Sequence, residues 1–217
     1  MKEKNKTELK EEVEEISEIL FLAQESLKVV RFLIKEEDDD DRAYTKRVNA
    51  FFVYTTSIYW RVIVIELCKL FSTRENEDYR LHKFISKLKA NGHFGDAGIS
   101  PGLINQWETD LENEKDVIDN LILQRNKIYA HKDRNSKAVV NTVTLKKTTE
   151  LIEVVQKIIR EIYFTVFETS FLVNDPINAP VQNLEYIVNV LADEKKRREK
   201  PWRKLAKEHG IEGEFKD

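Results

Sequence analysis

Residues 103–131, LINQWETDLENEKDVIDNLILQRNKIYAH, carry the pattern that decides the fold. Apolar side chains recur every three or four residues along this stretch, and this spacing places them on one face of an α-helix. They are Ile104, Trp107, Leu111, Ile118, Leu121, Ile122, Ile128 and Tyr129. The stretch therefore predicts one long amphipathic helix that buries this face against other helices.

The composition of the whole chain agrees with a helical protein. Of its 217 residues, 41% are hydrophobic and 35% are charged, and there are only 6 Gly and 4 Pro. Such a mixture favours long amphipathic helices over a turn-rich β-sheet protein. We expect an all-α fold, an antiparallel bundle of about five to six helices.

Further helices are predicted on both sides of the first stretch. Their expected ranges are 7–35, 42–71, 78–90, 144–173 and 182–198. The run 36–41, EEDDDD, is expected to be a solvated connection because like charges repel one another in a helix. Two prolines within 174–180 end the helix before them. We therefore expect a helical bundle over residues 1–175, and over 176–217 a C-terminal helix and polar tail, packed on the bundle or extending from it.

The charge balance limits the way in which the chain could bind nucleic acid. The formal net charge is −3, so no basic field covers the whole protein and any such contact needs local patches. The run 195–198, KKRR, is one local basic cluster that could contact phosphates. The end of a solvated helix explains this cluster better.

Cysteine use and hydropathy indicate the compartment. Cys68 is the only cysteine and lies in an apolar run, so we expect a buried thiol and a reducing environment. Residues 51–71 are the best candidate for a membrane helix, but Arg61, Glu66 and Lys69 interrupt them, so we expect a buried helix instead. The N-terminal residues show no apolar signal segment. These features predict a cytoplasmic protein without membrane contact.

No cysteine or histidine has the spacing of a metal site. His82, His93 and His209 lie far from one another and from Cys68 in the sequence. The glycine-rich stretch 91–102, NGHFGDAGISPG, lacks the GK[ST] ending of a phosphate-binding loop. We therefore expect neither a metal ion nor another cofactor.

The end of the first stretch carries the candidate chemistry. Arg125 continues the seven-residue spacing of Leu111 and Ile118, so an α-helix would place its charge on the apolar face, where it needs a partner or a water-filled cleft. In the same helix His131 would lie about 9 Å further along the axis and about 120° around it. An arginine can hold a phosphate and a histidine can transfer a proton near neutral pH. The pair could therefore cut RNA without a metal.

Residues 125–133, RNKIYAHKD, resemble the motif of the HEPN superfamily of helical nucleic-acid-processing proteins, in its AbiU abortive-infection branch. In that motif an Arg, often followed by a polar residue, precedes a His by a few positions. The residues that match are Arg125, Asn126, Lys127, Ala130, His131 and Asp133. The stretch 57–71, SIYWRVIVIELCKLF, is also similar to the long helix that precedes the motif in this branch. The likeness covers about residues 10–175.

The resemblance implies a helical bundle that dimerises and brings two motifs into one cleft. Many members are metal-independent endoribonucleases that act as toxins or antiviral effectors, and some are inactive scaffolds or bind small ligands. By this resemblance Arg125 would hold the scissile phosphate, and His131 would transfer a proton as the RNA 2′-hydroxyl attacks. Asn126 would position the phosphate or the histidine.

Other residues near the motif are candidates for RNA contact or for support of the site. Those for RNA are Lys127, Lys132 and Arg61, and those for support are Asp133 and Tyr129. Structural alternatives remain open for the two main residues: a buried ion pair for Arg125, and an interaction with the helix dipole for His131.

Together these features predict a metal-independent endoribonuclease of a defence or toxin–antitoxin type system. Its Arg/His site would be composite, formed at a homodimer interface, because one helix separates the two groups beyond hydrogen-bond contact. RNA would be the substrate, and an antitoxin protein is a further candidate partner. The alternative is a non-catalytic helical module that binds a partner protein or a nucleotide.

Overall fold

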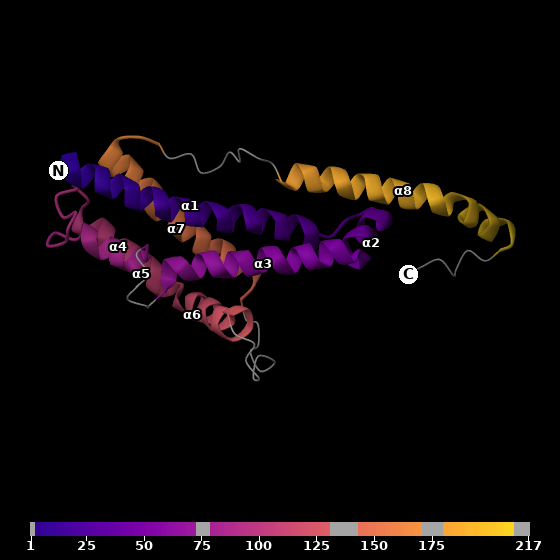
Figure 1. Ribbon diagram of the computed structural model, residues 1–217, viewed down its shortest axis with the longest axis horizontal. Helices are drawn as coiled ribbons and strands as arrows, with labels where there is room; N and C mark the ends of the chain where they lie inside the picture. The colour runs from indigo at the N-terminus through magenta and orange to yellow at the C-terminus, as the bar shows by residue number, and fades with distance from the viewer. Residues whose placement is uncertain (1–2, 73–78, 131–142, 171–179, 211–217) are drawn as a thin grey trace. The chain divides into compact units, whose positions relative to one another are not determined.

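The computed structural model describes residues 3–72, 79–130, 143–170 and 180–210 (Figure 1). These residues form helices and no strand, which confirms the all-α expectation. The elements are α1 (Glu3–Ile34), α2 (Asp40–Val48), α3 (Ala50–Phe71), α4 (Leu81–Leu88), α5 (Pro101–Asn113), α6 (Lys115–Gln124), the π-helical turn η1 (Arg125–Ala130), α7 (Leu145–Phe167) and α8 (Pro180–Glu208).

The chain forms two compact units. The first unit comprises Met1–Lys28 and Ile58–Ile177, and the second comprises Val29–Ser57 and Asn178–Asp217. Helices α1 and α3 therefore each contribute residues to both units. The motif and its supporting helices α4 to α7 belong to the first unit.

The first unit has an apolar core to which α1 and α3 to α7 contribute. Fully buried side chains come from α1, α3, α4, α5 and α7, and examples are Leu9, Ile63, Leu81, Trp107 and Leu151. Helix α7 begins at a cap in which the Thr144 hydroxyl accepts a hydrogen bond from the Lys147 N–H. Its expected core face is buried at Leu151, Val155 and Ile158, as the apolar spacing predicts. This core fixes the helices that carry the motif.

Two of the expected helices are broken by single residues. The range 42–71 is divided at Asn49, whose extended backbone separates α2 from α3 and whose side-chain oxygen accepts a hydrogen bond from the Phe51 N–H. The long helix expected from 103 is divided at Glu114, which leaves helical geometry with φ −93° and ψ 5°. The structure therefore has more and shorter helices than the periodicity predicts.

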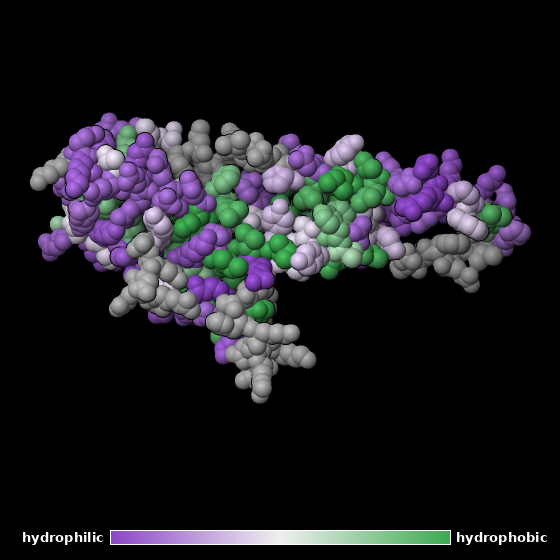
Figure 2. Space-filling model, in the orientation of Figure 1, coloured by the Kyte–Doolittle hydropathy of each residue, from purple (hydrophilic) through white to green (hydrophobic). Residues whose placement is uncertain are grey.

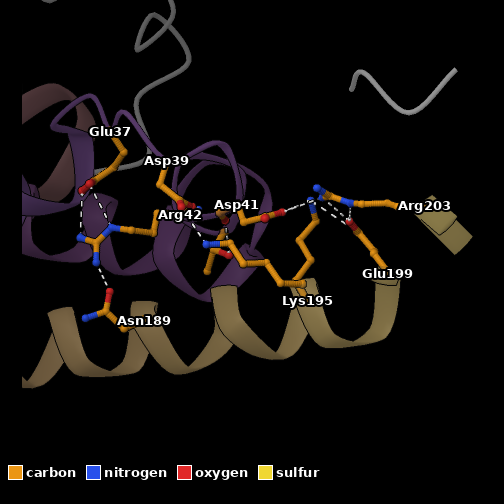
Figure 3. Close-up of polar contacts among 10 residues, drawn as sticks. Glu37, Asp39, Asp41, Arg42, Asn189, Lys195, Glu199 and Arg203 are labelled. Atoms are coloured by element: carbon orange, nitrogen blue, oxygen red, sulfur yellow. Dashed lines mark hydrogen bonds and ion pairs between the residues drawn. The ribbon is translucent and has the colours of Figure 1, made fainter. Parts of the chain in front are cut away.

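The acidic run does not behave as a solvated connection over Asp39 to Asp41. Asp39 caps α2, since its carboxylate accepts a hydrogen bond from the Arg42 N–H at 3.0 Å. Asp40 and Asp41 form the first turn, where negative charge is favoured by the helix dipole. Asp41 is buried and pairs with Lys195 at 3.0 Å and with Arg203 at 3.2 Å (Figure 3). The expectation of a connection holds for residues 36–38, which lie between α1 and α2, and was wrong for Asp41, because its partners Lys195 and Arg203 are remote in sequence.

Helix α8 is longer than the expected range 182–198. It continues to Glu208 through Pro201, in place of the expected polar tail. Ion pairs between residues four apart link Lys195 to Glu199 and Glu199 to Arg203, and such pairs stabilise a helix. Apolar side chains remain exposed on its N-terminal half (Figure 2), with Tyr186 70% exposed.

Helix α3 is the one helix in the described ranges that is long and apolar enough to cross a membrane. Core helices of soluble proteins have the same length and apolar composition, so these two features alone do not indicate a membrane helix. Its C-terminal half is buried in the first unit, for example at Ile63 and Leu67, as expected. Its N-terminal half exposes Phe51 and Tyr54, which the expectation of a buried helix did not include.

Candidate nucleic-acid-processing site

The motif begins where α6 ends, and it changes the type of helix. Arg125 still has α-helical backbone angles, φ −53° and ψ −50°, and from Arg125 to Ala130 the chain forms the π-helical turn η1. In a π-helix each N–H bonds to the carbonyl five residues back. Such turns are rare and are frequent at functional sites. The apolar spacing along residues 103–131 does not predict this turn.

The π-helical turn corrects the geometry expected for the motif. The values of 9 Å and 120° between Arg125 and His131 assumed an uninterrupted α-helix. A π-helical turn holds more residues than an α-helical turn, so the rotation from one residue to the next is smaller. His131, Lys132 and Asp133 lie outside the described residues.

Arg125 and Asn126, two of the predicted site residues, are in contact. The Arg125 Nε–H donates a hydrogen bond to the Asn126 side-chain oxygen at 3.3 Å, and both residues are half-buried. This bond helps to set the direction of the planar guanidinium group. Arg125 takes part in further interactions, so its position is held by more than this one bond. The charge that the sequence placed on an apolar face is therefore partly enclosed and oriented.

The buried face of α6 holds the start of the motif in place. Val117, Leu121 and Gln124 are buried and anchor the helix up to the residue before Arg125. Leu123 and Ile128 are about two-fifths exposed, at 42% and 39%. Ile128 was expected on the buried face, and its exposure is a correction that follows from the change to π-helical geometry. Two exposed apolar side chains thus stand within three residues of Arg125 in the sequence.

Three further predicted site residues lie on η1 and on α3. Lys127 is half-buried in η1, and Arg61 is exposed on α3 in the same unit. Both take part in further interactions. Tyr129 belongs to η1, and its side chain lies outside the described part. Within the ranges that the structure describes, no group of three or more His, Cys, Asp or Glu side chains could hold a metal ion.

The fold and the motif define a helical module of the HEPN type. The model of the AbiU2 family, a HEPN family, matches residues 6–185. This match covers most of the chain, including α2, α3 and the whole motif, so the chain belongs to the AbiU2 family of HEPN proteins. The family predicted from RNKIYAHKD is thereby confirmed. No curated protein and no solved structure gives a significant match to the chain.

Proposed function

We propose that this protein is a metal-independent endoribonuclease in a defence system of the abortive-infection or toxin–antitoxin type. The observation that carries the proposal is the half-buried Arg125, which is oriented by Asn126 on a π-helical turn in a chain of the AbiU2 family. Family membership supports a HEPN-type module. The local geometry supports a site at this turn, because π-helical turns are frequent at functional sites and Arg125 stands at the start of this one.

The proposed reaction uses the RNA as its own nucleophile. The 2′-oxygen forms a bond to the phosphorus while the bond to the 5′-oxygen breaks, which leaves a 2′,3′-cyclic phosphate and a 5′-hydroxyl. Arg125 would neutralise the charge that grows on the phosphate oxygens. His131 would accept the 2′-hydroxyl proton or donate a proton to the leaving 5′-oxygen. Asn126 would keep the guanidinium directed at the phosphate.

A homodimer would complete this site. Leu123 and Ile128, two residues before and three residues after Arg125 in the sequence, are exposed and offer apolar area for a second copy of the motif. In a dimer with two-fold symmetry, each composite site would combine Arg125 of one copy with His131 of the other. Each site would then hold one arginine for the phosphate and one histidine for proton transfer.

The first test compares wild type with Arg125→Ala and His131→Ala. Both variants should lose cleavage of a fluorescent RNA by about 100-fold or more, with melting temperatures close to wild type. Arg160→Ala, which removes an exposed arginine from α7, is the matched control and should keep full activity. Cleavage should persist in excess EDTA and leave 2′,3′-cyclic phosphate or 3′-phosphate ends. A requirement for Mg²⁺, or products with 3′-hydroxyl ends, would contradict the mechanism.

The second test mixes the two inactive variants. If each site takes its arginine and its histidine from different copies, a heterodimer of Arg125→Ala with His131→Ala contains one intact site. Statistical mixing should therefore restore about a quarter of wild-type activity. No recovery in a mixture shown by mass to contain heterodimers would reject the composite site. Full activity of both single variants would place the site away from this motif, and a wild type that cleaves no RNA would favour a non-catalytic module instead.

A further inference from the structure

A surface pocket lies beside the motif helix in the first unit. Its volume is about 290 Å³, which is near the lower end of the range for small-molecule sites. The end of α3, together with α4, α5 and α6, forms its walls. Its apolar lining comes from Phe71, Ile85, Leu111 and Ile118. A pocket of this size and lining suits one flat group better than a long chain.

The pocket and the motif share one face of α6. Ile118 lines the pocket and stands seven residues before Arg125, and α-helical geometry holds up to Arg125. Seven residues correspond to about 10 Å along the axis and to a rotation of only about 20°. This distance is about the rise of three stacked nucleotides of one strand. An RNA strand with a phosphate at Arg125 can therefore reach the pocket with a neighbouring nucleotide.

The polar rim of the pocket favours a base over a phosphate. Glu108 and Glu112 stand on this rim and would repel a phosphate, while their carboxylate oxygens can accept hydrogen bonds from N–H groups. Their charge is partly balanced, since Glu108 pairs with Lys89 at 2.7 Å and Glu112 with Lys115 at 3.0 Å. The rim thus offers acceptors without a large net charge.

A histidine completes the pocket as a flat polar ring. Burial lowers the pKa of His82 from its usual value, and the nearby Arg80 charge lowers the pKa further. The neutral imidazole is therefore favoured at neutral pH. Unstacked RNA bases commonly stack on aromatic rings, including those of Phe and His, and hydrogen-bond along their edges. Phe71, His82 and the two carboxylates supply both kinds of contact.

We propose that this pocket binds one unstacked base of the RNA held at Arg125, and that it prefers bases with an exocyclic amino group. This inference rests on the proposed ribonuclease function. Cytosine presents an amino group that Glu108 or Glu112 can accept from, whereas uracil presents a carbonyl oxygen at the same position, which the carboxylates repel. The pocket would then determine which sequences are cut.

The experiment measures binding of the full chain to two fluorescent oligonucleotides that cannot be cleaved, oligo-cytidine and oligo-uridine with 2′-methoxy groups. Wild type should bind oligo-cytidine at least about 5-fold more tightly, the lower limit for one specific base contact. Glu108→Gln/Glu112→Gln should reduce this preference to less than about 2-fold. Asp119→Asn, which removes an exposed carboxylate from α6 outside the pocket, should keep the preference.

The outcomes separate this inference from the proposed function. If Arg125→Ala weakens binding of both oligonucleotides while the double glutamine variant keeps the wild-type preference, the pocket assignment is wrong and the function stands. A wild type that binds both sequences equally also overturns the pocket assignment. If neither oligonucleotide binds, and Arg125→Ala cleaves RNA as wild type does, both proposals fail. Melting temperatures of the variants show that the fold is intact.

Discussion

Helix α7 of the first unit and helix α8 of the second unit are held in place by different kinds of contact. In the first unit, α7 presents a continuous apolar face, with Leu151, Val155 and Ile158 fully buried. In the second unit, the buried apolar side chains of the described part of α8 are Val188, Ala192 and Ala206, two of them small. Helix α8 instead contacts α2 through charged groups (Figure 3). Apolar burial is almost independent of salt and pH, and ion pairs depend on both.

The ionic contacts of the second unit differ among themselves. The Lys46 side chain is only 1% exposed, and its ammonium lies 2.7 Å from Glu37 and 2.8 Å from the Lys35 carbonyl oxygen. It also lies over the Phe32 ring. Lys196 and Asp39 pair at 2.7 Å but are about two-fifths exposed. We therefore expect the free energy of unfolding to depend most on the buried groups and least on the exposed ion pairs.

The largest effect is expected in the apolar core of the first unit. Trp107 is fully buried, and its indole N–H donates to the Glu161 carboxylate. Trp107→Ala should lower the free energy of unfolding by about 4 kcal/mol, because it leaves a large cavity. Urea unfolding followed by circular dichroism measures this change. Trp202→Ala, at a side chain that is 64% exposed, should change it by less than about 0.5 kcal/mol, and a similar loss in both would refute the contrast.

A smaller effect is expected at the buried cation of the second unit. Lys46→Ala should cost about 3 kcal/mol, since it leaves the Lys35 carbonyl oxygen without its buried donor and the Glu37 carboxylate with Arg42 alone. The exposed neighbour Arg47 provides the control, and Arg47→Ala should be nearly neutral. Denaturant unfolding with separate probes for each unit measures both. A loss of less than about 1 kcal/mol for Lys46→Ala would mean that this unit is held by apolar burial after all.

The contact between α2 and α8 should weaken when Asp41 loses its charge. Asp41→Asn keeps the shape of the side chain but removes its attraction for Lys195 and Arg203, at an expected cost of about 1–2 kcal/mol. Hydrogen exchange should become faster along α8 and stay unchanged in α7. Asp40→Asn removes an exposed carboxylate from the same turn and should leave α8 protected. Equal exchange in the two variants would assign the docking of α8 to its apolar side chains.

The smallest effect is expected from acid on the exposed pairs. Hydrogen bonds from Lys196 and from Arg203 lower the pKa of Asp39 and of Glu199, respectively. A lowered pKa means that the stabilisation is complete above the unfolded values of 4.5 and 3.8, and is lost as the pH falls through the folded values. Each exposed pair contributes at most about 1 kcal/mol.

Amide NMR signals of the second unit should therefore be unchanged between pH 7 and pH 5 and should shift below about pH 4.5. High salt at pH 7 should weaken the same exposed pairs. Signals of α7 serve as the reference within the same sample. Loosening of α8 between pH 7 and pH 5 would point to a different group and would contradict the assignment.

Apolar periodicity was sufficient to predict the helical class and the core of the first unit. The face of α7 was correct because a stripe of Leu, Ile and Val can only be stable when buried. The motif was found because a charge at Arg125 interrupts such a stripe. The backbone of the motif could not be predicted, since the change from α- to π-helix depends on packing and not on the local choice of residues.

The second unit was harder to predict because its contacts join remote segments. The acidic run and the basic cluster each look like solvated charge when considered alone, yet Asp39 pairs with Lys196 and Asp41 with Lys195. No periodicity connects two segments more than 150 residues apart. The break at Asn49 likewise depends on one local hydrogen bond, from the Phe51 N–H to the Asn49 side chain, which helix propensity does not predict.

The π-helical turn also affects how the protein would respond to the insertion or deletion of one codon. One turn of this kind contains one residue more than an α-helical turn, so it corresponds to a single inserted codon. Deleting the codon of Ile128 would allow α6 to continue as an α-helix without turning the residues that follow, because the π-helical turn holds one extra residue. The same deletion within α6 would rotate all later residues by about 100° relative to the helices before them. The turn could therefore absorb a single in-frame deletion that would redirect the motif if it occurred elsewhere in the helix.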